Sequence, residues 1–287
     1  NSTVTIKSGG SIVINDNSTT TGTGDKAETV YNSTFSATKG LTVEAGAELI
    51  IKSLVVSTKD SSGNAVPTVV TNKGTVTLDG AVLEGEFKVN MAADKAVVQV
   101  LNVQSDKSKT GTVTITDAGL KFADKKTIVG TTEGTVANTV TIAVGSNVVK
   151  GLTVVETVSS KTVDGQTKYY NTLDLAGAVS VSAEAETDNA TQIITVSGNR
   201  IAVTGEPTLG KNVNMTVSGK ISVSGKLVAT EENSKVTSNV EEKEDFTVSG
   251  LVQTIAKIDK ISAAMYETKS GTTTLYNYTT LKAAVDA

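Results

Sequence analysis

Apolar and polar residues alternate along most of this chain, so that every second position is apolar. In residues 212–230, NVNMTVSGKISVSGKLVAT, Val213, Met215 and Val217 alternate with polar residues up to a Ser-Gly pair, and Ile221 and Val223 then resume the alternation. A period of two places successive side chains on opposite faces of a strand. The stretch is therefore predicted to be strand, turn, strand, and it contains no residue suited to catalysis.

A short motif recurs along the chain: Thr-Val-Thr, then Ile or Leu, with a Gly within a few residues. Copies start at Thr3, Thr75, Thr112 and Thr139, and a related form, apolar-Thr-Val-Ser-Gly, ends at Gly198, Gly219 and Gly250. Each copy predicts one strand that ends near a Gly able to adopt positive φ at a turn or corner. The irregular spacing suits the rungs of a parallel β-helix with loops of varying length, and also the hairpins of an elongated β-sandwich. We favour the β-helix and keep the sandwich as the alternative.

The composition supports an all-β fold. The 287 residues include 46 Thr, 40 Val and 26 Ser, but only four Phe, six Tyr and no Trp. Thr and Val have restricted first side-chain torsions and fit a pleated sheet better than a helix. Because Val and Ala bury little area each, we expect a thin, long core made of many similar layers.

The chain divides into three parts by pattern. Residues 1–230 form the β-rich repeat region, and residues 231–245, EENSKVTSNVEEKED, carry six carboxylates and two Lys. We interpret this acidic segment as a solvated loop or hinge, with a divalent-cation site as the alternative. In residues 246–287 the apolar period becomes helical, which predicts a small mixed C-terminal appendage. The residues at helical spacing are Leu251, Ile255, Ile258 and Met265, and then Leu281 and Val285 behind Thr280 as a candidate N-cap.

Most catalytic and cofactor chemistry lacks its usual residues here. The chain has no Cys and no His, so thiolate nucleophiles, Ser-His triads and Cys/His metal sites are excluded. Glu84 and Glu86 lie two apart and are expected to share one strand face, where a solvated face is the simpler interpretation of the pair. Gly22 and Gly24 resemble part of a dinucleotide fingerprint but lie in a Thr-rich stretch without the required strand and helix. We therefore predict no catalytic residue, no cofactor and no metal site.

Charge and hydropathy restrict the partners. The net charge is −4, with Arg200 as the single Arg, so there is no basic footprint for nucleic acid. No apolar run approaches the length of about 18 residues that a membrane-spanning helix needs.

The local aromatic clusters are two pairs of tyrosines, Tyr169 with Tyr170 and Tyr276 with Tyr278. Packing is the simpler interpretation of these pairs, and stacking on sugar rings is the alternative. Six sequons make Asn1, Asn17, Asn32, Asn189, Asn214 and Asn277 candidate glycosylation sites.

The segment LYNYTTLKAAVDA, residues 275–287, resembles the short helix that opens β-helix modules in adhesin-like surface proteins of bacteria and archaea. Together with GLTVEAGAELIIKS and NKGTVTLDGAVLEG, it is similar in style to Thr/Val/Gly-rich prokaryotic surface proteins, S-layer proteins and extracellular filament subunits. This resemblance implies a secreted or cell-surface protein, and a start at Asn1 rather than Met agrees with a removed signal peptide or, equally, with a fragment of a longer chain.

These observations predict a non-enzymatic structural subunit of an extracellular filament, sheath or surface layer. Its partner would be a second copy of itself, joined through β-strand contacts. The N-terminal strand, with Thr3, Val4, Thr5 and Ile6, is the candidate strand donor. The alternative is an adhesin that binds a cell-surface glycan or a host protein through loops, and a carbohydrate-active enzyme on a β-helix ranks third.

Overall fold

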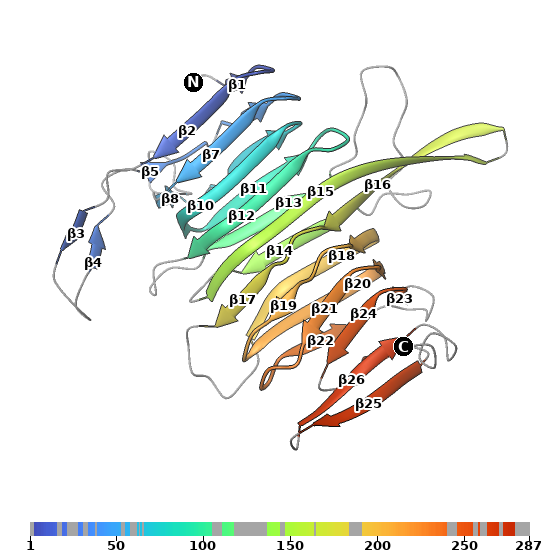
Figure 1. Ribbon diagram of the computed structural model, residues 1–287. Coiled ribbons are helices and arrows are strands. Elements are labelled where there is room, and N and C mark those ends of the chain that lie inside the picture. The colour runs from blue at the N-terminus through green and yellow to red at the C-terminus, as the bar shows by residue number, and fades with distance from the viewer. Residues whose placement is uncertain are drawn as a thin grey trace.

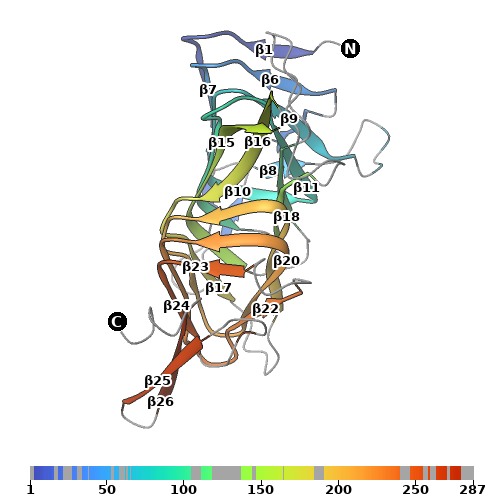
Figure 2. The same cartoon turned by 90° about the vertical axis from the view of Figure 1, so that its right-hand side faces the viewer.

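The computed structural model is a β-solenoid, which confirms the all-β class and the parallel β-helix in place of the sandwich (Figure 1). It describes residues 3–15, 19–21, 28–30, 34–37, 39–52, 55–57, 62, 64, 66–104, 111–117, 137–143, 147–163, 165–183, 191–239, 246–254, 258, 263–269 and 272–278. All the regular secondary structure among these residues is β-strand. Since no helix occurs in this part of the chain, none is present there that could cross a membrane. The molecule is elongated, with β1 (Val4–Ile6) at one end and the hairpin of β25 (Ala263–Lys269) and β26 (Thr272–Tyr278) at the other (Figure 2).

The N-terminal half winds in one direction around three faces, and the ladder pairings within each face of this half are parallel. Face 1 contains β1 (Val4–Ile6), β6 (Leu41–Val43), β9 (Thr68–Asn72), β11 (Glu86–Met91) and β13 (Thr112–Thr116). Face 2 contains β2 (Ser11–Asn15), β7 (Glu48–Lys52) and the first parts of β10 (Thr75–Glu84) and β12 (Val97–Gln104). Face 3 contains β5 (Thr34–Phe35), β8 (Val55–Ser57) and the last parts of β10 and β12. A separate hairpin pairs β3 (Thr19–Thr21) with β4 (Glu28–Val30).

The C-terminal half repeats the same three faces. Face 1 continues with the first parts of β18 (Thr191–Val203) and β20 (Val213–Val223), then β22 (Lys235–Ser238). Face 2 continues with the end of β16 (Gln166–Leu175), the last parts of β18 and β20, and β23 (Phe246–Val248). Face 3 continues with β17 (Ser180–Ala183), β19 (Thr208–Leu209), β21 (Lys226–Ala229) and β24 (Leu251–Thr254). The pairings within this half are again parallel, up to an antiparallel hairpin of β25 (Ala263–Lys269) and β26 (Thr272–Tyr278) on β24.

One rung between the two halves runs backwards. It consists of β14 (Thr139–Ala143) on face 1 and the first part of β15 (Asn147–Val163) on faces 3 and 2. β14 is antiparallel to β13 and to β18, while β15 is antiparallel to β12, β16 and β17. The chain thus reverses twice, and the C-terminal half runs in the same direction as the N-terminal half. We call β14 and residues 147–156 the reversed rung.

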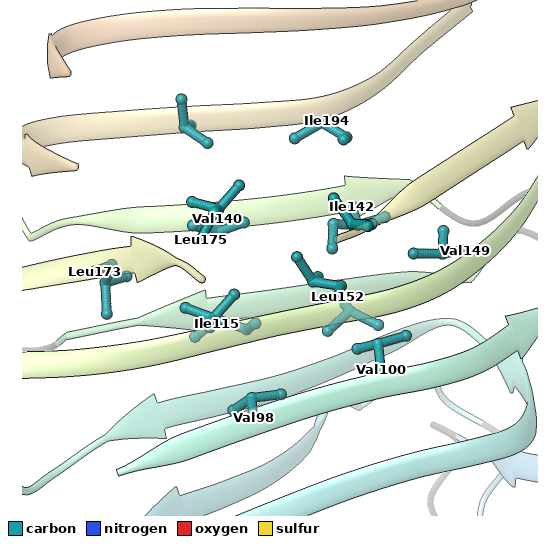
Figure 3. Close-up of a cluster of buried hydrophobic side chains, with 14 of the residues drawn as sticks. Val98, Val100, Ile115, Val140, Ile142, Val149, Leu152, Leu173, Leu175 and Ile194 are labelled. Atoms are coloured by element: carbon teal, nitrogen blue, oxygen red, sulfur yellow. The ribbon is translucent and has the colours of Figure 1, made fainter. Parts of the chain in front are cut away.

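The apolar core passes through the reversed rung without a break (Figure 3). Val140 of β14 lies opposite Ile115 on one side and Val196 on the other, and all three side chains are buried. On face 2, Leu152 lies opposite Val100. Side chains alternate in the same way along parallel and antiparallel strands, so a reversed strand still delivers every second side chain to the interior.

Glycines mark the corners, as the repeat motif predicted. Gly198 and Gly219 lie between faces 1 and 2 with φ of 127° and 88°, a region that disfavours residues with a Cβ. At the corner between faces 2 and 3, glycine is required because the backbones of neighbouring rungs approach each other closely, and not because of a positive φ. There Gly177, Gly205, Gly225 and Gly250 stack on successive rungs, and a Cβ on each would collide with the backbone carbonyl of the glycine one rung before it. We call this stack, which begins at Gly151, the glycine ladder.

The expected helix over Leu251, Ile255, Ile258 and Met265 is wrong where the structure describes those residues. Leu251 lies in β24, Met265 lies in β25, and Ile258 is buried outside any strand. The reason is tertiary: β21 and β26 offer hydrogen-bonding edges on both sides of β24, and ladder pairing overrides a local helical period. Ile255, Thr280, Leu281 and Val285 lie outside the described residues.

The acidic segment, residues 231–245, contains strand β22. The described strands before and after that segment belong to one sheet.

Candidate functional site

The N-terminal end of the solenoid leaves its core uncovered. Val4 and Ile12 stack on the buried Leu41 and Leu49 of the next rung, which places them on the inward face. Nevertheless Val4 is 48% and Ile12 38% exposed. Their counterparts further along the solenoid are buried because another rung lies on each side, and at this end that second neighbour is missing from the described residues.

The backbone at this end is open as well. Within the described strands, β1 pairs only with β6, and β2 pairs only with β7. The predicted strand-donor residues lie here, with Thr3 before β1 and Val4, Thr5 and Ile6 in it. Residues 3–15 contain Lys7 and no carboxylate. We call β1 and β2 the open end; whether its strands are donated to a neighbour stays a prediction.

The opposite end has a different character. The inward side chains Val236, Phe246 and Val248 are buried, so the core is covered there. Glu231 and Glu232 of the acidic segment are exposed at this end, and the carboxylate of Glu232 forms an ion pair of 2.8 Å with Lys211. Residues 3–15 thus carry one positive charge, whereas Glu231 and Glu232 place two carboxylates at the opposite end.

A second feature is a group of polar side chains buried inside the solenoid. Asp117 follows β13, Asn138 precedes β14, Glu156 lies in β15 and Asn171 lies in β16. All four are at most 2% exposed. They meet at the corner between faces 1 and 2, where the chain enters and leaves the reversed rung. We call them the buried polar cluster.

Hydrogen bonds hold the side chains of Asp117 and Asn138 in place. The backbone N–H and the side-chain amide of Asn138 each donate to a carboxylate oxygen of Asp117 at 2.6 Å. The Asn138 amide also donates to the backbone carbonyl of Asn171 at 3.1 Å, and the backbone N–H of Arg200 donates to Asn138 Oδ1 at 2.9 Å. These bonds connect β13, β14, β16 and β18 across the reversed rung.

The side chains of the other two members, Glu156 and Asn171, have no hydrogen-bond partner. Both carboxylate oxygens of Glu156 and both polar atoms of the Asn171 amide are buried without a hydrogen bond. Elsewhere the fold satisfies such groups: the equally buried Asn72, at the same corner, donates to the carbonyl of Val97 at 2.8 Å and accepts from the N–H of Gly74 at 3.0 Å. An unpaired buried polar group costs about 1–3 kcal/mol, and more when it is charged. Glu156 and Asn171 are therefore exceptions that need a physical explanation.

Burial also changes the acidity of the two carboxyl groups. Desolvation raises the pKa of Asp117 to about 7, although the Asn138 hydrogen bonds act in the opposite direction. Desolvation, followed by the nearby charge of Asp117, raises the pKa of Glu156 to about 8. The backbone N–H of Ala93 lowers this pKa, and the charge of Asp94 raises it.

Sequence reasoning missed this cluster, although the strand period contained a signal. Asp117 continues the inward positions of Val113 and Ile115, and Glu156 continues those of Leu152 and Val154. Asn138 and Asn171 likewise extend the inward positions of β14 and β16 by one step. A polar residue in phase with the buried side chains of its strand predicts a buried polar group.

Beyond the cluster, β15 and β16 leave the solenoid as a projecting hairpin, which we call the arm (Figure 1). The single Arg lies against its base. The Arg200 guanidinium stands 4.8 Å from the ring centre of Tyr170, and it donates to the hydroxyls of Thr172 and Ser159 at 3.4 Å. Of the predicted tyrosine clusters, Tyr170 is thus engaged in packing with Arg200.

Replacing Arg200 by Ala is expected to loosen the arm while leaving the solenoid folded. The cation–π contact and two long hydrogen bonds together contribute about 1 kcal/mol at a partly exposed site. Amide hydrogen exchange of residues 157–170 should become several-fold faster, and exchange in β12 should not change. Lys150→Ala, at an exposed position in the solenoid part of β15, is the control. Equal exchange in both variants would contradict a role for Arg200 in holding the arm.

Other predicted site residues are not brought together. Glu84 and Glu86 do not share a strand face, because Gly85 between them has φ of 113° and ends β10 on face 3 before β11 starts on face 1. Asn214 is the sequon residue with a described side chain, and its Oδ1 accepts from the Thr237 hydroxyl at 3.4 Å. Asn277, Tyr276 and Tyr278 lie in β26, and Tyr169 lies in β16. Asn1, Asn17, Asn32, Asn189, Gly22 and Gly24 lie outside the described residues.

No protein-family model, curated protein sequence or solved structure matches the chain. Within the described residues there is no group of three or more Asp, Glu, His or Cys side chains arranged for a metal ion.

Proposed function

We propose that this protein is a structural subunit of an extracellular filament, sheath or surface layer, and that a second copy of the chain covers the open end. The observation that carries the proposal is the uncovered core at β1 and β2. Val4 and Ile12 occupy core positions yet are exposed, next to backbone edges without a described partner. Open strand edges beside apolar side chains are the usual substrate for strand addition between chains.

The direction of the strands supports stacking of the open end of one copy on the acidic end of the next. Because the chain reverses twice, the last rungs run in the same direction as the first. A second copy can therefore continue faces 1 and 2 with the parallel pairing used within each half, whereas on face 3 the edge of β24 is already paired with β26. Lys7, in the carboxylate-free residues 3–15, would then face the exposed Glu231 and Glu232. Such a contact joins two different surfaces, which produces an open polymer rather than a closed dimer.

The energy of such a contact is modest at each position and adds up over the rung. Covering Val4 and Ile12 contributes about 1 kcal/mol each at roughly 25 cal/mol per Å² of apolar area. Each new ladder hydrogen bond contributes about 1 kcal/mol net. No special residue is needed, which agrees with a chain built from repeated Thr- and Val-rich strands.

The first test is negative-stain electron microscopy of the chain at increasing concentration, with light scattering after size exclusion. Filaments or sheets with an axial repeat near the length of one solenoid support the proposal. A closed dimer would place the open ends against each other and contradict a structural polymer. A monodisperse monomer at high concentration would contradict self-assembly, and glycan binding, the adhesin alternative, would then be tested.

Val4→Glu with Ile12→Glu is expected to abolish assembly without unfolding the monomer. Both positions are already exposed, so the monomer loses little apolar burial, whereas a second copy would have to bury two unpaired carboxylates. Assembly should weaken at least a hundred-fold in a sedimentation assay, with the melting temperature of the monomer nearly unchanged. The control is Leu101→Glu, because Leu101 is 43% exposed within β12 in the middle of the solenoid. Equal loss in the control would contradict a contact specific to the open end.

A further inference from the structure

We propose that the buried polar cluster is a binding site for one divalent cation of the size and oxygen preference of Ca²⁺. This inference concerns the interior of the solenoid and does not depend on the proposed assembly at the open end. It rests on the unpartnered side chains of Glu156 and Asn171, on their burial, and on the Asp117 carboxylate beside them.

The oxygens of the cluster are the kind that Ca²⁺ prefers. Glu156 offers two carboxylate oxygens without a hydrogen bond, and Asn171 offers an amide oxygen in the same state. The Asp117 oxygens each accept one hydrogen bond from Asn138 and keep a second lone pair. Carboxylate and amide carbonyl oxygens are the common protein ligands of Ca²⁺, which accepts six to eight of them in flexible geometry.

The strand register directs these groups toward one place. Glu156 lies opposite Leu173 and Asn171 lies opposite Val158, so the two residues are diagonal neighbours across the β15–β16 pair. Both are in phase with buried side chains and so point into the interior. They are nonetheless not hydrogen-bonded to each other. Diagonal neighbours on a sheet are about 7–8 Å apart, a separation that an ion can bridge.

Among the described residues the cluster also has no compensating positive side chain. The one Arg near it, Arg200, reaches the cluster only with its backbone N–H, and its guanidinium lies against Tyr170 on the arm. Among the described residues no Lys or Arg forms an ion pair with Asp117 or Glu156. Two carboxylates without a counter-charge are costly in an apolar interior, and a bound divalent cation removes that cost.

The position of the site gives the ion a structural role. Asp117 ends the N-terminal half, Glu156 lies in the reversed rung, and Asn171 begins the C-terminal half. A cation bound to all three would connect the segments where the winding direction changes. We expect selectivity for Ca²⁺ over Mg²⁺, because Mg²⁺ retains several waters and this site is fully buried.

The test is thermal unfolding of the full chain, refolded from urea either with EDTA or with CaCl₂, so that the ion can enter before the site closes. We expect Ca²⁺ at about 100 times its dissociation constant to raise the melting temperature by roughly 5 °C. Equal MgCl₂ should have little effect. Elemental analysis of the CaCl₂-refolded and dialysed protein should give one Ca²⁺ per chain.

Two variants locate the site and one controls for it. Glu156→Gln and Asp117→Asn should each lose most of the Ca²⁺-dependent shift, and the unchanged size of the Gln side chain lets the first variant fold in EDTA. Asp174→Asn, which alters a carboxylate bonded to Thr204 outside the cluster, should keep the shift. No shift in the unmodified chain, or a full shift in Glu156→Gln, would overturn the proposal.

Discussion

Gly225→Ala is expected to lower the free energy of unfolding by about 3 kcal/mol or more, among the largest effects of any single substitution in the solenoid. A Cβ at this position would collide with the carbonyl oxygens of Gly205 and Thr204, which are backbone atoms of the preceding rung. Neither atom can rotate away as a flexible side chain would. The rungs at this corner would have to separate, which breaks ladder hydrogen bonds on faces 2 and 3.

Urea denaturation of both variants measures this effect against a matched control. Gly40→Ala places a methyl group at a φ of 87°, with no atom within 4 Å of the new Cβ. It should cost about 1–2 kcal/mol, because only the backbone conformation is disfavoured. If Gly225→Ala were no more destabilising than Gly40→Ala, the glycine ladder would not be as tight as its contacts indicate.

The second large effect is a loss of stability as the pH rises in calcium-free protein. The folded chain keeps protons on Asp117 and Glu156 up to pKa values of about 7 and about 8. The unfolded chain releases them near their ordinary values of about 4. Between these limits the folded state binds more protons, so each rise in pH favours unfolding. The free energy of unfolding should fall by several kcal/mol between pH 5 and pH 8 and level off above pH 8.

Urea denaturation in EDTA at several pH values measures this loss, and Glu156→Gln isolates it. The variant keeps the size of the side chain and has no proton to lose, so its stability should depend less on pH than that of the unmodified chain. At pH 8 it should be the more stable of the two. Other charged groups near Glu156, such as Asp94, remain in both proteins and cancel in the comparison. Parallel pH curves for the two proteins would contradict the assignment.

The two proposed sites would serve two separate tasks. The open end is where growth by a second copy is proposed, and the buried polar cluster lies in the middle of the solenoid, away from that surface. Variants at Val4 and Ile12 should therefore change assembly without changing the calcium response. Variants at Glu156 should mainly change the stability of the monomer. This separation allows each proposal to fail without the other.

Local sequence pattern predicted the strands well because burial in a solenoid follows one simple period. Val213, Met215 and Val217 alternate in sequence and are buried, while Asn214 and Thr216 between them are half-buried. Gly198 and Gly219 were recognisable as corners because positive φ is a local property of the backbone. The helical period from Leu251 to Met265 was misleading, since β24 is fixed by pairing with β21 and β26, and β25 by its hairpin with β26.

The sequence by itself therefore determined the strand class, the inward residues and the glycine corners, which all depend on neighbours in the chain. The tertiary structure alone decided the reversed rung, because alternation is the same in parallel and antiparallel pairing and carries no information on direction. It also decided the open end, where Val4 and Ile12 have the pattern of core residues but are not covered by any rung among the described residues. The buried polar cluster likewise joins residues from Asp117 to Asn171 that meet only when the chain reverses, since burial of a charge depends on what surrounds it in space.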